Sequence, residues 1–519
     1  MKSTNIKYLV LALPLLLTGL AGCGKSSGHK SSSAESQTSS QTSSGGQSSQ
    51  SSGGGQSSST VDPEVKSVKV KFWHTFGQTI VDGLKSKITA FKAAVKEHDG
   101  VDVDVEMTYQ GGYDDIAKKI SDGYSVNNRP TIAVAYPDNV ADYLEIGKSN
   151  NEQFVVNLDK FINSNTVGFG KENWLGDKYG ADDFVSEFFE EGSRYAQAGT
   201  YSLPYMKSTE IMFYNMKLLK KAMPLYNAEI GNSEEKIKRF MKTITWDEFI
   251  DLNTVIKNNM SYISNNLEIP FLYDSDANYL VTKLFQNDIP YTTVDQTTGQ
   301  ADILFGKGEA LNETIRVLEE AHDYYENGIM TTKGIRGTYG SDFFTGEKAV
   351  FSIGSSGGSG YNFPQAEAFE LGVCRVPDAN NNPIYVSQGP TLALFSDRGL
   401  DDKVNEATQL YAWKFMKYIT NGETNAELCI EGSEGYVPVR YSAYETEYFR
   451  EFMEEGEDYA KCYEVVVQDV DEYLITDAFK GSAALRDEVG TLLTASLRES
   501  KSNIPANIQT AIDNARLKM

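Results

Sequence analysis

The stretch that decides the fold is Val68-Lys69-Val70-Lys71-Phe72-Trp73-His74. Its first apolar residues alternate with lysines, which is typical of a strand with one buried face. Residues 80–95 then have the apolar spacing of a helix, and residues 101–107 alternate again as a second strand. A shorter helical segment at 116–120 leads to an apolar strand at 131–135. This β-α-β-α-β order predicts an α/β fold whose parallel sheet has right-handed crossovers and helices on its faces.

The carboxyl ends of these strands are where a ligand is expected, because open α/β sheets bind ligands beyond that edge. Polar and aromatic residues follow each of the three strands closely. We therefore predict that five side chains contact a ligand: Trp73, His74, Tyr109, Tyr113 and Asp138.

Later segments predict further elements. Pro204 interrupts a strand-like stretch and predicts a bend between two strands, because proline cannot donate to a central ladder. Thr245 and Glu248 have the spacing of a capping box, so a helix is expected to begin there. The remaining expectations are helices at 247–258, 308–327, 402–420 and 485–499, and strands at 349–353 and 391–395.

Residues 1–22 have the pattern of a secretory signal. Lys2 and Lys7 precede an apolar run at 8–20 that is too short to span a bilayer stably. The run ends in Leu20-Ala21-Gly22-Cys23, which resembles the bacterial lipobox. The resemblance implies that Cys23 is lipidated and holds the protein at the outer face of the bacterial cytoplasmic membrane. An ordinary signal peptide that happens to contain a cysteine is the alternative.

Residues 23–60 form a segment rich in Ser, Gly, Gln and Thr. This segment lacks the apolar side chains that could offset the entropy of ordering, so a flexible tether spanning roughly 35 Å is expected. Residues 61–519 are the expected folded part, and their number favours two lobes over a single core.

The net charge of the chain excludes polyanionic binding partners. The formal charge is −24 for the whole chain, and it becomes −26 when Lys2 and Lys7 are removed with the signal. Such a surface repels nucleic acid and anionic lipid, so we expect neither as a partner.

The chain offers little for a metal or cofactor, and we expect none. Three cysteines follow Cys23, without a C-x-x-C pattern, which leaves open one disulfide or only buried thiols. There is no H-E-x-x-H zinc motif. Residues 274–278 imitate only the first half of a calcium loop, so a polar ligand-facing loop or a plain turn is expected there, with a weak metal site as the alternative.

The order of short motifs along the chain resembles that of the family 1 extracellular solute-binding proteins of ABC importers. The matching motifs are Phe72-Trp73-His74, Leu203-Pro204, Tyr214-Asn215, Thr245-Trp246, Phe344 through Val350, Ala412-Trp413-Lys414-Phe415 and Gly435-Tyr436-Val437-Pro438-Val439. The resemblance implies a two-lobed periplasmic-binding-protein-like fold (type II) with the ligand in the inter-lobe cleft. It implies a first lobe at 65–175 and 335–395, and a second lobe at 176–334 and 396–519.

This resemblance also implies a mode of action. A monomer would close by hinge bending around a small sugar or polyol and deliver it to an ABC permease in the membrane.

Within that family the chain is more particularly similar to the glycerol-3-phosphate, or glycerophosphodiester, branch. Two departures, at Tyr136-Pro137-Asp138 and at 273–279, remove stacking surface and add hydrogen-bond acceptors. The expected ligand is therefore a mono- or oligosaccharide, with glycerol-3-phosphate or a glycerophosphodiester as the alternative. The ligand-binding residues that the resemblance adds are Ser208, Tyr279, Ser355, Ser356, Gly389, Tyr436 and Arg486.

One motif points to an enzyme. Residues 354–358 satisfy the G-x-S-x-G pattern of a hydrolase nucleophile elbow around Ser356. That chain order needs a histidine after the serine, and the last histidine is His322, so such a hydrolase is excluded. We expect no enzymatic activity. A surface glycoside hydrolase that uses paired carboxylates, or a sensor lipoprotein without a transport role, is the remaining alternative.

Overall fold

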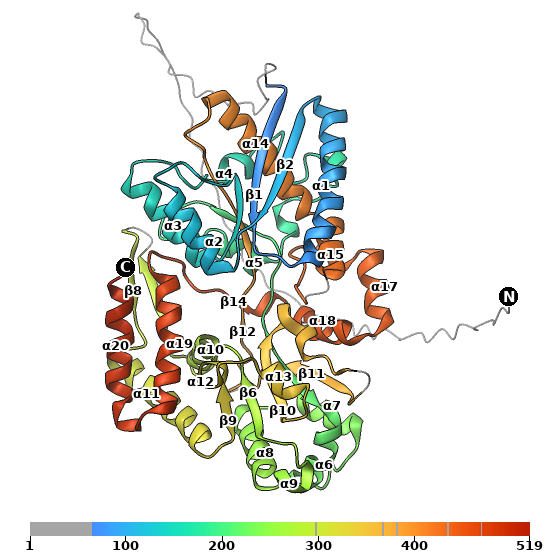
Figure 1. Ribbon diagram of the computed structural model, residues 1–519, viewed down its shortest axis with the longest axis vertical. Helices are drawn as coiled ribbons and strands as arrows, with labels where there is room; N and C mark the ends of the chain where they lie inside the picture. Colours follow the sequence, from blue (N-terminus) through green and yellow to red (C-terminus); the bar gives the residue numbers. More distant parts are fainter. Residues whose placement is uncertain (1–64, 296–297, 366–367, 380–381, 433–434, 469) are drawn as a thin grey trace, which may run out of the picture. The chain divides into compact units, whose positions relative to one another are not determined.

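The computed structural model describes residues 65–519 apart from 296–297, 366–367, 380–381, 433–434 and 469 (Figure 1). The expected signal peptide, the lipidation site Cys23 and the tether lie outside the described residues. Within the described part, the chain forms two five-stranded sheets, each with its own hydrophobic core and covering helices. The predicted α/β fold class is confirmed.

The first sheet contains the predicted parallel unit. Its strands, in spatial order, are β2 (Asp102–Tyr109), β1 (Ser67–His74), β3 (Ile132–Ala135), β13 (Thr391–Leu394) and β4 (Ser202–Pro204). β1 pairs in parallel with β2 and β3, whereas β13 is antiparallel to β3 and β4. The crossover helices are α1 (Gln78–Asp99) and α2 (Tyr113–Gly123), as the spacing predicts. α14 (Asp402–Ile419) also packs on this sheet, with the Phe415 and Phe72 rings 6.0 Å apart.

The second sheet mixes parallel and antiparallel pairs. Its strands, in spatial order, are β11 (Leu371–Arg375), β5 (Glu210–Asn215), β10 (Ala349–Ser355), β6 (Ile269–Tyr273) and β9 (Met330–Thr332). β10 runs antiparallel to β5 and parallel to β6. All residues of β5 and β6 are buried, which fits the apolar runs 211–214 and 269–272; Glu210 and Asn215 are the buried polar residues at the two ends of β5.

The chain crosses from the first sheet to the second between β4 and β5, and returns between β11 and β13. The bend predicted at Pro204 is present, because β4 ends at that residue as an edge strand of the first sheet and β5 begins the second sheet at Glu210. Isolated β-bridges join Lys207 to Val437 and Ser208 to Gln388. The crossing segments around these bridges therefore lie side by side between the two sheets.

The strand pairing differs from the expected division of the chain between the lobes. β10 and β11 fall inside 335–395 but belong to the second sheet, while α14 falls inside 396–519 and packs on the first. An apolar strand pattern shows that a strand is buried, and it carries no information on which sheet it joins.

Four longer predicted helices are present with small shifts at their ends: α8 (Trp246–Asn258), α11 (Gly308–Glu326), α14 and α19 (Ser482–Arg498). The capping box at the start of α8 is formed in both directions. The other helices are α3 (Pro137–Ser149), α4 (Asp159–Ile162), α5 (Ser186–Glu191), α6 (Met216–Tyr226), α7 (Glu234–Lys242), α9 (Met260–Ile263), α10 (Asp276–Gln286), α12 (Lys333–Arg336), α13 (Gly340–Phe344), α15 (Gly422–Glu431), α16 (Tyr441–Tyr444), α17 (Glu447–Glu455), α18 (Asp458–Gln468) and α20 (Ile504–Arg516). Two small pairs complete the strands: β7 (Thr292–Asp295) with β8 (Gln300–Ile303), and β12 (Tyr385–Val386) with β14 (Tyr473–Leu474).

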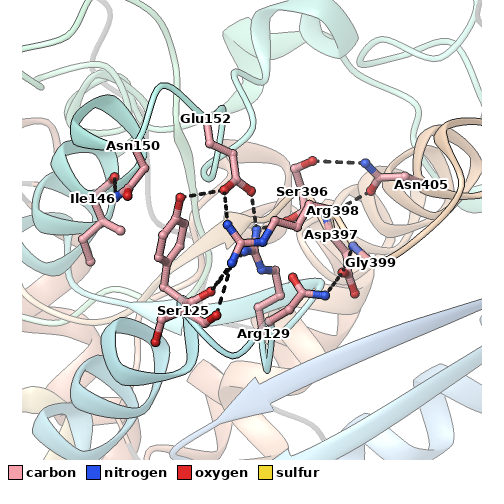
Figure 2. A network of polar contacts seen from close by, with 12 residues as sticks. Ser125, Arg129, Ile146, Asn150, Glu152, Ser396, Asp397, Arg398, Gly399 and Asn405 are labelled. Atoms are coloured by element: carbon pink, nitrogen blue, oxygen red, sulfur yellow. Dashed lines mark hydrogen bonds and ion pairs between the residues drawn. The ribbon is translucent and has the colours of Figure 1, made fainter.

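A polar network ties the loop before β3 to the loop after β13 (Figure 2). The Arg129 side chain is fully buried; its Nη1 donates to Glu152 Oε1 at 2.6 Å and to the Ser396 carbonyl at 2.9 Å. Glu152 Oε2 accepts from the Tyr124 hydroxyl at 2.6 Å and from Arg398 Nη1 at 3.2 Å. The network lies at the edge of the sheet opposite to the carboxyl ends of β1 and β3, so it fixes the sheet without entering the expected ligand site.

Three further observations bear on the sequence predictions. The cysteines left open by their odd number are unpaired and buried: Cys374, Cys429 and Cys462. Among the described residues, no helix has the length and apolar character needed to cross a membrane. The same residues contain no group of three or more His, Cys, Asp and Glu side chains placed to hold a metal ion.

Candidate functional site

A cavity of about 860 Å³ lies where the carboxyl ends of the first sheet face the second sheet and its crossing segments. This volume is within the range of small-molecule sites in proteins. Seven of the twelve predicted site residues line it: Tyr113, Asp138, Ser208, Ser355, Gly389, Tyr436 and Arg486. Tyr113 and Asp138 of this set were predicted from strand ends, and the other five from the family resemblance; their role in ligand binding stays a prediction.

The other five predicted residues do not line the cavity. Trp73 and His74 are buried at the end of β1, where the His74 ring stacks on Phe76, and burial lowers the pKa of His74. Tyr109 is 63% exposed and lies outside the cavity lining. Tyr279 belongs to α10 and is buried in the second core, because the expected polar loop is a helix. Ser356 is buried and its hydroxyl accepts from the Thr209 amide at 3.3 Å.

Two acidic side chains form the floor of the cavity. Glu210 begins β5; its carboxylate accepts from the Tyr273 hydroxyl and, at 3.3 Å, from Asn278 Nδ2. Burial raises the pKa of Glu210 to about 8. Asp274 follows β6 directly and accepts from the Gly340 amide at 2.6 Å, and burial raises the pKa of Asp274 to about 6. Neither carboxylate has an ion-pair partner among the described residues.

Arg486 connects the two sides of the cavity. Its Nε lies 3.4 Å from Asp138 Oδ2 at the start of α3, which borders the first sheet. Its Nη1 donates to Asn278 Oδ1 at 2.9 Å on α10, and its Nη2 donates to Thr476 at 3.4 Å. Each nitrogen of the guanidinium group therefore has one protein acceptor, and these three contacts use three of its five N–H donors.

Lys207 and Glu191 form a buried ion pair at the crossing segments. Lys207 Nζ lies 2.6 Å from Glu191 Oε2, and neither side chain is more than 8% exposed. Glu191 Oε1 also accepts from the Ser387 hydroxyl at 3.1 Å. Gly389 is next to this pair with φ at +92°, and a Cβ there would lie 2.3 Å from the Met206 carbonyl oxygen. Glycine is thus required at this position for the crossing segments to approach each other.

Tyrosine rings supply the stacking surface of the cavity. The rings of Tyr113 and Tyr136 lie 4.5 Å apart, and the Tyr436 ring packs against Gly357, where a Cβ would come within 3.0 Å. Tyr339 and Tyr361 also line the cavity and are largely exposed. These two rings were not predicted, because nothing in the local sequence separates them from ordinary surface tyrosines.

The charges of the cavity are mostly negative. Its carboxylates are Asp114, Asp138, Glu191, Glu210, Asp274, Asp342 and Asp487, and its cations are Lys207, Lys333 and Arg486. Two of the three cations are held in ion pairs, with Glu191 and with Asp138. The third, Lys333, packs on the Tyr339 ring at 3.7 Å. The arrangement favours neutral or cationic ligands over anionic ones.

Sequence reasoning missed most of these carboxylates. Glu210 could have been found, because it is a charged residue directly before the apolar run 211–214, where the chain enters a core. Asp274 follows an apolar strand in the same way. Asp342 and Asp487 lie on helices, where their spacing is that of ordinary solvated faces.

The comparisons with known proteins agree with this geometry. A family model described as bacterial extracellular solute-binding protein matches residues 88–454. Among curated protein sequences, none matches the chain significantly.

Solved structures of the same two-lobed fold include three sugar- or phosphodiester-related proteins. The GacH receptor of Streptomyces glaucescens, studied unliganded and with acarbose, is 18% identical with a TM-score of 0.60, over 86% of this chain and 98% of that one. The cyclic alpha-maltosyl-1,6-maltose binding protein of Arthrobacter globiformis is 16% identical with a TM-score of 0.63, over 86% and 98%. UgpB of Mycobacterium tuberculosis, in complex with glycerophosphocholine, is 16% identical with a TM-score of 0.61, over 87% and 99%. At these identities the likeness establishes the fold, and it confirms the expected two-lobed architecture.

Proposed function

Because the chain belongs to the family of bacterial extracellular solute-binding proteins, we propose that it is the ligand-capturing component of an ABC importer for a carbohydrate. The observation that supports this most is the cavity between the two sheets, where tyrosine rings and hydrogen-bonding side chains face the same space. Sugars bind by stacking on aromatic rings and by satisfying their hydroxyl groups with carboxylates and amides.

The crossing segments supply the means of closure. Ser208 connects the cavity to the crossing segments, because it lines the cavity and also forms a β-bridge with Gln388. A ligand that touches both sides binds the closed form more tightly and so shifts the protein toward it. The closed protein would then dock on a membrane permease, with the Cys23 lipid anchor keeping it at the outer face of the membrane.

A glycerophosphodiester is the second candidate ligand. It is supported by the similarity of the fold to UgpB, whose structure contains glycerophosphocholine. A phosphate is less favourable in this cavity, because the Arg486 guanidinium already contacts Asn278 and Asp138 and because carboxylates outnumber cations in the lining. We therefore rank the carbohydrate first.

A thermal-shift screen tests the proposed function. The purified protein is heated with mono- and oligosaccharides, with glycerol-3-phosphate and with glycerophosphocholine, and binding raises its melting temperature by mass action. Tyr361→Ala should abolish the shift, because this side chain is 80% exposed and lines the cavity. Tyr262→Ala, at a tyrosine that is 71% exposed and lies outside the cavity, is the matched control.

Two further readouts separate the alternatives. The sugar is recovered after incubation and analysed for hydrolysis, because a glycoside hydrolase would return a shorter product. Metabolic labelling with palmitate, compared with Cys23→Ser, tests the anchor. A shift by the phosphorylated polyols alone would reverse our order of ligands, and unlabelled wild-type protein would refute the lipid anchor.

A further inference from the structure

We propose that Tyr339 and Lys333 bind one pyranose ring of the carbohydrate, and that Asp276 is a positioning residue that holds them at the cavity. The inference rests on the proposed function, because it assigns a subsite within the same cavity. Neither the strand ends nor the family resemblance pointed to Tyr339 or Lys333 as a ligand contact.

The backbone brings the chain before Tyr339 to the cavity at one edge of the second sheet. β6 and β9 are parallel, and Tyr273 is level with Thr332, so both strands end at the same edge. The next residue after each strand, Asp274 after β6 and Lys333 after β9, lines the cavity. Because β9 is the outermost strand on this side, Lys333 lies at the margin of the wall that the sheet provides, about 4.8 Å beyond β6.

Tyr339 contributes an exposed aromatic ring to this margin. It is 53% exposed and lines the cavity. The ammonium group of Lys333 lies 3.7 Å from the centre of the ring, over one of its faces. The opposite face can stack on the apolar face of a sugar, which removes apolar surface of both molecules from water.

Lys333 adds hydrogen-bond donors beside the ring. An ammonium group carries three donors, and Lys333 Nζ has no hydrogen-bond acceptor among the described residues. The other cations of the cavity, Lys207 and Arg486, are held in ion pairs. Lys333 is therefore placed to donate to the hydroxyl oxygens of a sugar that stacks on Tyr339.

Asp276 fixes the chain on both sides of Lys333. Its Oδ1 accepts from the Thr332 hydroxyl at 2.7 Å, and its Oδ2 accepts from the Gly334 amide at 3.0 Å. Thr494 of α19 donates to Oδ1 as well, at 2.9 Å. A Cβ at residue 334 would lie 2.4 Å from the Thr494 hydroxyl oxygen, so this close approach of the chain to α19 requires glycine. α12 is thus held against α10 and α19 (Figure 1).

The chain after Tyr339 is held in a similar way. The Gly340 amide donates to Asp274 Oδ1 at 2.6 Å, and a Cβ at residue 340 would lie 2.8 Å from Ser352 Oγ of β10. Anchors on both sides of the tyrosine restrict its backbone, so little conformational entropy remains to be lost when a ligand binds.

These contacts give a role to the acidic motif at 274–276. Its spacing imitates the start of a calcium loop, but its carboxylates accept hydrogen bonds from two glycine amides and two threonine hydroxyls. Asp276 is 9% exposed and does not line the cavity. It therefore acts on a ligand through the chain that it holds, which makes it a positioning residue.

Isothermal titration calorimetry tests the subsite. The probes are glucose, galactose, maltose, maltotriose and cellobiose, and the sugar that binds the wild type most tightly is used for all variants. Tyr339→Ala should weaken its binding by about 10- to 100-fold, whereas Tyr339→Phe keeps the ring and should change it by less than about threefold. Tyr179→Ala, at a tyrosine that is also 53% exposed but lies outside this cavity, should leave the affinity unchanged. Lys333→Met keeps the aliphatic stem and should weaken binding by about 3- to 10-fold.

A double-mutant cycle tests the role of Asp276. Asp276→Ala should weaken binding by about 5- to 10-fold in the wild-type background, and by less than about threefold in the Tyr339→Ala background. Asp276→Asn retains an acceptor oxygen and should recover part of the loss. Near-ultraviolet circular dichroism confirms that every variant is folded. A purely structural role of Asp276 would lower the melting temperature and leave the affinity of the folded protein as in the wild type.

The outcomes separate this inference from the proposed function. Unchanged binding by Tyr339→Ala refutes the subsite and leaves carbohydrate capture intact. Equal losses from Tyr339→Phe and Tyr339→Ala refute the stacking. A loss from Asp276→Ala that is the same in both backgrounds refutes its role as a positioning residue for Tyr339. If no sugar of the set binds, the inference is refuted, and the proposed function falls with it when glycerophosphocholine binds instead.

Discussion

Replacing Glu210 with glutamine should change how the stability of the unliganded protein depends on pH. In the unfolded chain this carboxyl has its ordinary pKa of 4.5, and in the folded protein burial raises the pKa to about 8. Between these values the folded protein holds a proton that the unfolded chain has released, so stability falls as the pH rises. The loss ends above the folded pKa, where both states are ionised.

The size of the effect follows from the two pKa values. A rise from 4.5 to about 8 corresponds to at most about 5 kcal/mol of unfolding free energy, at about 1.36 kcal/mol per pH unit. Between about pH 6 and about pH 9 the linkage relation assigns about 2 to 3 kcal/mol of this loss to Glu210. Glu210→Gln cannot ionise, so the variant should escape that loss; its single amide oxygen can still accept from Tyr273 or from Asn278, which contact different oxygens of the glutamate.

Urea denaturation at several pH values measures the effect. The unfolding free energy of Glu210→Gln minus that of the wild type should increase by about 2 to 3 kcal/mol from about pH 6 to about pH 9. Taking this difference cancels the titration of all other groups. Glu235→Gln, at an exposed carboxylate, should track the wild type throughout. A difference that stays constant over this range would refute the assignment of a buried, proton-holding carboxyl to the cavity floor.

Three further predictions concern the framework around the cavity. Glu152→Gln should destabilise the protein by about 2 to 4 kcal/mol at neutral pH in urea denaturation, because the buried Arg129 loses its partner. Burial opposes ionisation of Glu152, but the hydrogen bonds from Tyr124 and Arg129 lower its pKa overall. The loss of unfolding free energy in Glu152→Gln should therefore become smaller as the pH falls below 4.5. A loss that does not depend on pH would contradict the ion pair of Glu152 with Arg129. Gly389→Ala should cost at least about 2 kcal/mol and abolish ligand-induced thermal shifts, whereas Gly337→Ala, with φ at +72° and no neighbour within 4 Å, should cost about 1 kcal/mol and leave the shifts intact. Lys207→Met should cost about 3 to 5 kcal/mol by leaving Glu191 buried without its partner, and adding Glu191→Gln should recover most of it; equal losses in the single and double variants would argue against the pair.

The parts of the fold that sequence predicts best are those with strong periodicity. Alternation over 67–74 and helical spacing over 80–95 identify β1 and α1, and the Thr245–Glu248 box marks the start of α8. The placement of β10 in the second sheet could not be predicted, because its pairing with β5 and β6 depends on contacts distant in the sequence. The N-terminal signal and lipidation site stay predictions.

Some predicted site residues line the cavity because their position in the sequence also fixes their position in the fold. Asp138 follows a strand end and Gly389 occupies a motif loop, and both line the cavity. Trp73 and His74 are the last two residues of β1, and their side chains are buried in the core. Alternation along a strand gives the face of a residue near its middle, whereas the last residues can bend either way. Tyr279 was expected in a loop and is helical, because Ser275 caps α10 by accepting from the Asn278 amide.

The guanidinium of Arg486 has a kinetic consequence for cargo. Its contacts join α3 on one side of the cavity to α10 on the other, so any widening of the entrance must first break bonds to Asp138 or Asn278. We expect these contacts to slow the dissociation of a bound ligand even where Arg486 does not touch the ligand. We therefore expect the time for which a ligand is retained to depend on Arg486, although the partners of this side chain belong to the protein itself.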